Sequence, residues 1–178
     1  DEPTGSVRVL GVSRQGQTLT VDHSTLTDAD GPKTILATQW LADGEPIAGA
    51  VGNQLVLTQR LVEKTISVKL RYSDGTYQRD VYSNETGPVQ DVQDAPTGAV
   101  TLSGGSPPAE KTTLTANAQQ VSDLDGMGDI SWEWLANGRI IPSDGSNVLE
   151  LTQALVGARI AARASYRDGL GKVETVTS

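Results

Sequence analysis

The residues of this sequence best suited to chemistry are aspartates that recur in one short pattern. In each half of the chain, two aspartates one residue apart precede a glycine, and a third aspartate further on also precedes a glycine. These are Asp28, Asp30 and Asp74, and then Asp123, Asp125 and Asp168. Ca²⁺ binds six to eight oxygen atoms, several of them from carboxylates. The pattern therefore indicates a candidate calcium site in each half, provided that the fold brings the three side chains together.

A second interpretation explains the same aspartates without a ligand. The sequence contains six Asp-Gly pairs and one Asn-Gly pair, and these pairs tolerate the positive φ angles that tight turns require. No complete calcium loop such as an EF-hand is present. At the level of the sequence, a cation site and plain turn formation both remain open.

The tripeptide Asp22-His23-Ser24 contains the residue types of a catalytic triad, but its spacing argues against one. Adjacent residues on a strand point to opposite faces, so these side chains cannot form a converging chain of hydrogen bonds. His23 is also the single histidine of the sequence. No HExxH pattern or phosphate-binding glycine loop occurs. We therefore expect a protein that is not an enzyme.

The composition narrows the classes of partner. With 14 basic and 22 acidic residues the formal net charge is −8, and an acidic surface repels nucleic acid. The absence of cysteine excludes disulfides and zinc–thiolate sites. No apolar run approaches the length of a membrane span, so we expect no membrane insertion.

The sequence begins within a repeated motif, and we expect a fragment of a longer secreted chain that is monomeric as a fragment.

An internal repeat determines the domain organisation, because six segments return after 93 to 95 residues. The paired segments are Asp1–Gly5 with Asp94–Gly98, Thr18–Thr20 with Thr113–Thr115, Asp28–Gly31 with Asp123–Gly126, Trp40–Gly44 with Trp134–Gly138, Leu55–Gln59 with Leu149–Gln153, and Tyr72–Gly75 with Tyr166–Gly169. An offset this constant indicates two copies of one fold.

Apolar residues alternate within each copy, as in half-buried strands. Ile66, Val68 and Leu70 are separated by polar residues, and the stretch from Ile160 to Tyr166 repeats the pattern. About seven short strands per ~90 residues, separated by turns, is typical of a sandwich. The sequence predicts an all-β fold of two tandem immunoglobulin-like β-sandwiches. We expect Trp40 and Trp134 to be buried between the sheets of their own sandwiches.

We expect the first sandwich at residues 1–88 and the second at 89–178, with a linker at about 84–95. Pro88 and Pro96 bound a segment with few apolar residues, and proline lacks the N–H that a strand ladder needs. The sequence therefore predicts two separate cores, neither of which includes the linker.

The motifs of the first copy resemble a known family. Trp40 to Ile47 (WLADGEPI), Leu55 to Thr58 and Ile66 to Val68 are similar to the tandem bacterial Ig-like repeats of large exported proteins, such as RTX-type adhesins and cadherin-like arrays. Leu55 departs from the family, which often has Tyr there, and Glu63 stands where the family has Gly. The resemblance implies a non-catalytic extension or spacer repeat at the cell surface or in the extracellular medium. Its partners would be the neighbouring repeats of the same chain.

The segment from Val89 to Pro96 is similar to the linkers of cadherin-like bacterial repeats, in which Ca²⁺ stiffens the joint. In an immunoglobulin-like sandwich the loops with the repeated aspartates lie at one pole, beside the N-terminus. For the second copy we therefore expect a calcium site built from Asp123, Asp125 and Asp168 with the linker residues Asp91 or Asp94. For the first copy we expect a weaker site built from Asp28, Asp30 and Asp74.

Two other functions remain open at this level. The chain is also consistent with a module that binds carbohydrate or protein, or with an accessory domain of an exported enzyme. Trp132 lies two residues before Trp134 and shares its face, so it serves either the core or a sugar-stacking surface. Tyr77 and Tyr82 have the same two interpretations.

Overall fold

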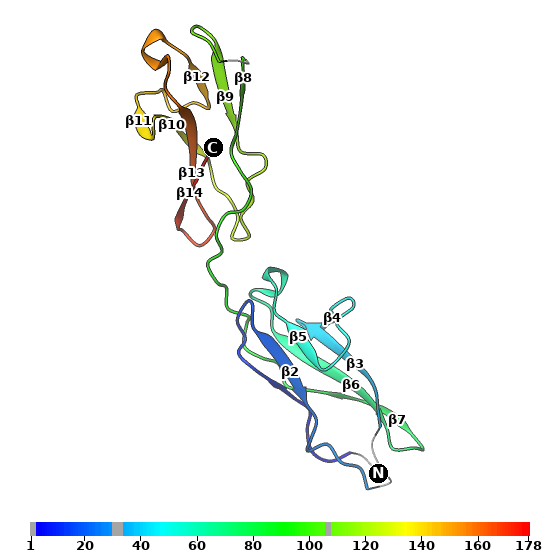
Figure 1. Cartoon of the computed structure of the whole chain (residues 1–178). Coiled ribbons are helices and arrows are strands. Elements are labelled where there is room, and N and C mark those ends of the chain that lie inside the picture. Colours follow the sequence, from blue (N-terminus) through cyan, green and yellow to red (C-terminus); the bar gives the residue numbers. More distant parts are fainter. Residues whose placement is uncertain (1–2, 30–33, 106–107) are drawn as a thin grey trace. The chain divides into compact units, whose positions relative to one another are not determined.

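The structure is a computed structural model that describes residues 3–29, 34–105 and 108–178. Across these residues it contains 14 strands, which are arranged in four sheets, and two short 3-10 helices (Figure 1). The chain divides into two compact units, Asp1–Val92 (unit 1) and Gln93–Ser178 (unit 2). No helix in the described part of the chain has the length and apolar character to cross a membrane.

Unit 1 is a sandwich of a three-stranded and a four-stranded antiparallel sheet, with strand orders β1-β2-β5 and β4-β3-β6-β7. Its elements are β1 (Arg8–Leu10), β2 (Thr18–Asp22), β3 (Thr34–Ala42), β4 (Glu45–Pro46), β5 (Gln54–Val56), η1 (Gln59–Leu61), β6 (Ile66–Ser73) and β7 (Gln78–Tyr82).

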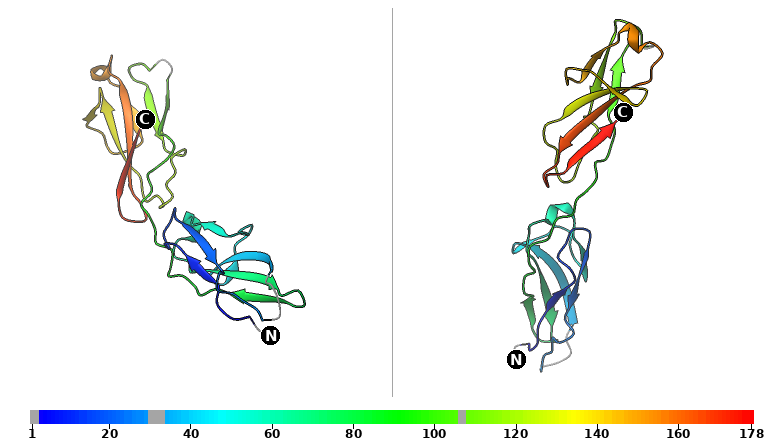
Figure 2. Two further views of the ribbon diagram at one scale, coloured as in Figure 1. Left: turned by 60° about the horizontal axis from the view of Figure 1, so that its bottom comes forward. Right: turned by 90° about the vertical axis from the view of Figure 1, so that its left-hand side faces the viewer.

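Unit 2 repeats this arrangement with strand orders β12-β9-β8 and β11-β10-β13-β14. Its elements are β8 (Thr101–Gly104), β9 (Thr113–Asn117), β10 (Ser131–Ala136), β11 (Arg139–Ile141), β12 (Val148–Glu150), η2 (Gln153–Leu155), β13 (Ile160–Arg167) and β14 (Val173–Thr177). The views in Figure 2 show that each unit consists of two layers of strands. The predicted all-β fold of two immunoglobulin-like sandwiches is confirmed.

The repeated Asp/Asn-Gly pairs form tight hairpins at corresponding places. Asp43 and Gly44 connect β3 to β4 with φ angles of 50° and 81°, and Asn137 and Gly138 connect β10 to β11 with 52° and 79°. Two consecutive positive φ angles define a type I′ turn, whose twist matches that of the strands it joins. For these pairs, turn formation is sufficient to explain the sequence.

The repeated Thr-Gly pair before the first strand of each unit has a steric cause. A Cβ atom at Gly5 would lie 1.9 Å from the carbonyl oxygen of Thr25, and one at Gly98 would lie 1.8 Å from that of Gln120. The preceding threonine forms an isolated antiparallel bridge in each unit, from Thr4 to Thr27 in unit 1. Glycine is therefore required where the incoming chain passes close to the loop after the second strand.

Each unit has its own hydrophobic core centred on one tryptophan. Trp40 and Trp134 are both fully buried, and each belongs to the core cluster of its own unit. Their indole N–H groups donate hydrogen bonds to the backbone carbonyls of Gly52 (2.9 Å) and Ser146 (3.1 Å). The expected burial of both tryptophans and the expected separation of the two cores are confirmed.

The boundary between the units differs from the expected one. The structure places it between Val92 and Gln93, whereas the sequence indicated 88/89 and a linker at about 84–95. Val89 is 2% exposed and belongs to the core of unit 1. The few apolar residues of this segment gave no sign that one of them, Val89, is buried in the core of unit 1.

Replacing either tryptophan by alanine should unfold one unit selectively. We expect Trp40→Ala to lower the unfolding free energy of unit 1 by about 3 to 5 kcal/mol, through the cavity and the lost burial, while unit 2 is unchanged. Trp134→Ala should have the reverse effect. Hydrogen exchange of peptides from each unit measures this, and equal losses in both units would contradict separate cores.

Candidate functional site

Two of the predicted aspartates of unit 2 accept hydrogen bonds from one side-chain donor near the start of that unit. Asp125 belongs to the connection between β9 and β10, and Asp168 to the connection between β13 and β14. The Nε2 atom of Gln93 donates hydrogen bonds to Oδ2 of Asp125, at 3.0 Å, and to Oδ2 of Asp168. The backbone N–H of Asp94 donates to the same Oδ2 atom of Asp125 at 2.6 Å. The Gln93 amide therefore links the two carboxylates through hydrogen bonds, and the backbone N–H of Asp94 adds one to Asp125.

Asp168 is a buried charge that its own turn stabilises. It is 5% exposed, and its Oδ1 atom accepts a hydrogen bond from the N–H of Lys172 at 2.8 Å. Burial alone would raise the pKa of Asp168, but hydrogen bonds from Gln93 and from N–H groups of the turn outweigh it, so the pKa lies below its ordinary value. The carboxylate is therefore ionised at neutral pH.

Asp123, the third aspartate of this pole, is held by a tyrosine. The hydroxyl of Tyr166 on β13 donates a hydrogen bond to its Oδ2 atom at 2.6 Å, and the N–H of Asp125 donates to its Oδ1 atom at 3.0 Å. Burial raises the pKa of Tyr166, and the neighbouring Asp123 carboxylate raises it further. The hydroxyl is therefore a permanent donor across the physiological pH range.

Unit 1 repeats the tyrosine–aspartate pair. The hydroxyl of Tyr72 on β6 donates to Oδ2 of Asp28 at 3.2 Å. Asp74 is 4% exposed, and its Oδ1 atom accepts hydrogen bonds from the N–H groups of Thr76 (2.6 Å) and Tyr77 (2.7 Å). These N–H groups hold the pKa of Asp74 below its ordinary value. Its other oxygen, Oδ2, is buried and accepts no hydrogen bond from the described residues. Asp30 lies outside the described residues.

Asp91, the remaining predicted ligand, belongs to unit 1. Its carboxylate accepts hydrogen bonds from the N–H of Val92 (2.9 Å) and from Nε2 of Gln59 (3.5 Å). A contribution of Asp91 to the site of unit 2 stays a prediction. The structure thus brings Asp123, Asp125 and Asp168 to one pole of unit 2 with the backbone of Asp94, and it places Asp28 near Tyr72 in unit 1.

The described residues do not form a ready-made metal cage. No group of three or more His, Cys, Asp or Glu side chains among them has the arrangement to hold a metal ion. At the pole of unit 2 the carboxylates instead face N–H and O–H donors, as the hydrogen bonds of Gln93 and Tyr166 show. Binding of calcium there would require the Gln93 amide to move or to turn its oxygen inward.

Sequence reasoning missed three of the residues that organise these poles. The sequence shows Tyr72 and Tyr166 only as members of repeated, alternating segments, and Gln93 only as part of the expected linker. A signal for the tyrosines was available, since each returns at nearly the same offset as its aspartate partner. Gln93 has no such signal, because its role depends on where the incoming chain passes the pole.

The other candidate residues are Trp132, two exposed tyrosines and the single histidine. Trp132 is half-buried and packs against the core of unit 2, which favours the core interpretation. Tyr77 and Tyr82 are 61% and 59% exposed. His23 is half-buried directly after β2.

No known protein-family model matches the sequence, and no curated protein matches it either. The resemblance to bacterial Ig-like repeats therefore stays a hypothesis that rests on the motifs themselves.

Removal of the Gln93 amide should destabilise unit 2 alone. Gln93→Ala removes one donor from each of the carboxylates of Asp125 and Asp168, and a lost hydrogen bond to a charged group costs about 1 to 3 kcal/mol. We expect a loss of this size in the unfolding free energy of unit 2, measured by hydrogen exchange in the presence of a calcium chelator. Gln119→Ala, at an exposed position of the same unit, is the matched control. Equal stability of both variants would show that the amide contributes nothing.

The contribution of each tyrosine–aspartate hydrogen bond to the stability of its unit can be measured, and the two contributions can be compared. Tyr166→Phe removes the hydroxyl that Asp123 accepts, and we expect unit 2 to lose about 1 to 2 kcal/mol of unfolding free energy. Tyr72→Phe should have a smaller effect on unit 1, because its hydrogen bond is longer. A double-mutant cycle with Asp123→Asn measures the coupling between the partners. Strictly additive effects would argue against the pair.

Proposed function

We propose that this chain is a non-catalytic extension or spacer portion of a large bacterial surface or secreted protein of the adhesin type. The observation that carries the proposal is the repetition of one sandwich, strand for strand, in two units with separate cores. Copies of one fold repeated along a chain add length without new chemistry. Its partners in this proposal are the neighbouring repeats of the same chain, and its location is extracellular or on the cell surface.

The hydrogen bonds that the polar side chains make at the pole of unit 2 also support a spacer function. Asp125 and Asp168 accept hydrogen bonds from Gln93, and Asp123 accepts one from Tyr166. These groups hold the loops in position and tie the incoming chain to the sandwich. Such bonds define the direction in which the chain enters unit 2, which is a mechanical property that a spacer needs.

Calcium at the poles is the second part of the proposal. In unit 1, the buried Oδ2 atom of Asp74 accepts no hydrogen bond from the described residues, and a buried carboxylate oxygen requires a donor or a cation. In unit 2, a turn of the Gln93 side-chain amide would present its oxygen beside Asp125 and Asp168, and this adds a neutral ligand of the type Ca²⁺ accepts. We propose ligation by Asp123, Asp125 and Asp168 with Asp91 or Asp94. Ligation by Asp28, Asp30 and Asp74 is weaker in this proposal.

A binding function is the second candidate, and one observation favours it. Tyr82 is more than half exposed on β7, which is an edge strand of the four-stranded sheet of unit 1. Exposed aromatic rings stack on sugars and anchor protein partners. Binding of a carbohydrate or protein that Tyr82→Ala abolishes, while the fold of unit 1 is retained, would favour this function over the spacer.

Calcium titration tests the calcium part of the spacer proposal. We expect isothermal calorimetry to detect a site that Asp125→Ala removes, and a weaker one or none that depends on Asp30. We also expect millimolar Ca²⁺ to raise the melting temperature of unit 2 and to change the small-angle scattering profile, with Mg²⁺ as the control cation. If Ca²⁺ changes neither quantity, the aspartates serve only as turn and loop residues.

A further inference from the structure

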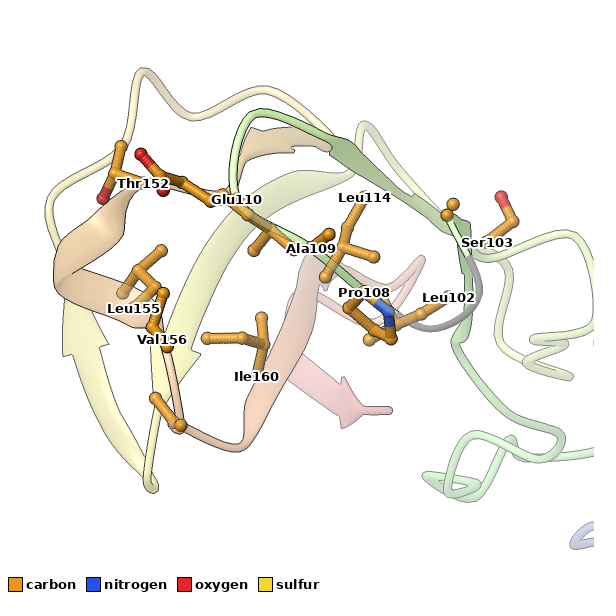
Figure 3. A pocket seen from close by; sticks show the side chains of 15 residues that line it. Leu102, Ser103, Pro108, Ala109, Glu110, Leu114, Thr152, Leu155, Val156 and Ile160 are labelled. Carbon is orange, nitrogen blue, oxygen red and sulfur yellow. The ribbon is translucent and has the colours of Figure 1, made fainter.

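Unit 2 contains an open groove, lined mainly by apolar side chains, beside η2 and the adjoining ends of β8 and β13. The cavity has a volume of about 460 Å³ and lies between the two sheets. Figure 3 shows Leu155 and Val156 on one side, and Leu102 and Pro108 on the other. Ile160 lies between these two sides. When another apolar group covers the side chains that line such a groove, the removal of apolar surface from water stabilises the folded protein.

The corresponding place in unit 1 is filled by Val89. This residue is 2% exposed and belongs to the core that contains Leu61 and Ile66, the counterparts of Leu155 and Ile160. The segment around Val89 forms parallel bridges with the chain on both sides of the sandwich, from Val89 to Val62 and from Gln90 to Arg14.

Four backbone hydrogen bonds hold this segment in unit 1. On one side, Val89 donates to the carbonyl of Lys64 at 3.0 Å and accepts from the N–H of Glu63 at 2.9 Å. On the other side, Gln90 donates to the carbonyl of Ser13 at 2.9 Å and accepts from the N–H of Gln15 at 2.8 Å. The segment is therefore an additional strand-like element that closes the end of the sandwich.

The backbone donor and acceptor that pair with such a segment are also present in unit 2. Gly157 and Ala158 are the counterparts of Glu63 and Lys64. Glu63 and Gly157 have positive φ angles of 65° and 81°, and the turn after the 3-10 helix is closed by the same hydrogen bond, Lys64 to Leu61 and Ala158 to Leu155, at 3.1 Å in both units. Neither the N–H of Gly157 nor the carbonyl of Ala158 makes a backbone hydrogen bond with another described residue.

The apolar side chains of this turn are correspondingly less covered in unit 2. Leu61 is 8% exposed and Ile66 is fully buried, whereas their counterparts Leu155 and Ile160 are only half-buried. Val156 is 62% exposed, although its counterpart Val62 is half-buried against the core. Unit 2 thus exposes both the apolar surface and the backbone groups that Val89 covers in unit 1.

The end of β14 has the right position to deliver an equivalent segment. Ser178 makes the same pair of hydrogen bonds as Ser83 does. Its N–H donates to the carbonyl of Ala162 at 2.9 Å, and its hydroxyl accepts from the N–H of Ala162 at 3.0 Å. Ser83 forms the equivalent pair with Val68. In unit 1 the chain reaches the groove within the few residues between Ser83 and Val89.

We propose that this groove of unit 2 is an acceptor site for an extended segment that continues from β14 and has the chemistry of Thr86–Gln90. The occupant is a β-branched aliphatic side chain preceded by proline, and its backbone pairs with Gly157 and Ala158. The segment then closes unit 2 and sets the direction in which the chain leaves it. This inference is independent of calcium and of the choice between a spacer and a binding module.

The test is to append the sequence of residues 84–92 directly after Ser178 in the full chain. We expect the melting temperature of unit 2 to rise by about 4 °C or more, and amide exchange at Gly157 to slow by at least about tenfold, because its N–H gains an acceptor. The same appended sequence with its first valine replaced by aspartate is the matched control and should give neither effect. Val89→Asp in unit 1 should lower the melting temperature of that unit.

A variant on the groove side separates docking from a general effect of a longer chain. Val156→Asp changes an exposed side chain, so it should leave the original chain as stable as before but abolish the gain from the appended segment. The proposal is overturned if the appended segment changes neither melting temperature nor Gly157 exchange in a folded chain, or if the aspartate control gives an equal gain. It is also overturned if a free peptide of residues 84–92 protects Gly157 while the appended segment does not, because the site would then take a separate chain.

Discussion

The packing of one tryptophan between two sheets is the interaction on which each half of this protein depends. Trp40 and Trp134 have no solvent exposure, and each indole N–H reaches a backbone carbonyl in the connection that leads to the opposite sheet, at Gly52 and Ser146. The ring supplies a large apolar surface, and its one polar group is satisfied. With no cysteine in the chain, this contact performs the role that an inter-sheet disulfide has in other immunoglobulin-like domains.

The poles of the sandwiches obey a second constraint, which is that a carboxylate removed from water needs donors. Asp168 and Asp74 are almost completely buried. Hydrogen bonds from Gln93 and from loop N–H groups keep the pKa of Asp168 below its ordinary value, and loop N–H groups do the same for Asp74. The tyrosine hydroxyls extend the same principle to Asp123 and Asp28. The aspartates therefore act in turn formation and in loop anchoring at once, and a cation would have to compete with donors that are already in position.

The two units also differ at the other end of the sandwich, where the chain leaves it. In unit 1, Val89 completes the core and its neighbours add backbone hydrogen bonds. In unit 2 the equivalent turn retains its geometry but leaves Val156 exposed. In unit 1 a segment outside the strand framework buries this apolar surface, so the boundary of that unit is set by packing and not by the proline and glycine content of the segment.

The amino-acid sequence alone determined the all-β fold, the two copies and the burial of Trp40 and Trp134, because alternation, turn residues and a constant repeat offset are local or periodic properties. It also selected the aspartates of the poles, but it did not reveal their partners. Gln93 lies far from Asp125 and Asp168 in the chain, and only the folded backbone brings its amide to both. Tertiary structure likewise decided that Val89 belongs to unit 1, because the burial of a single side chain depends on which groove the chain crosses and no local pattern encodes that.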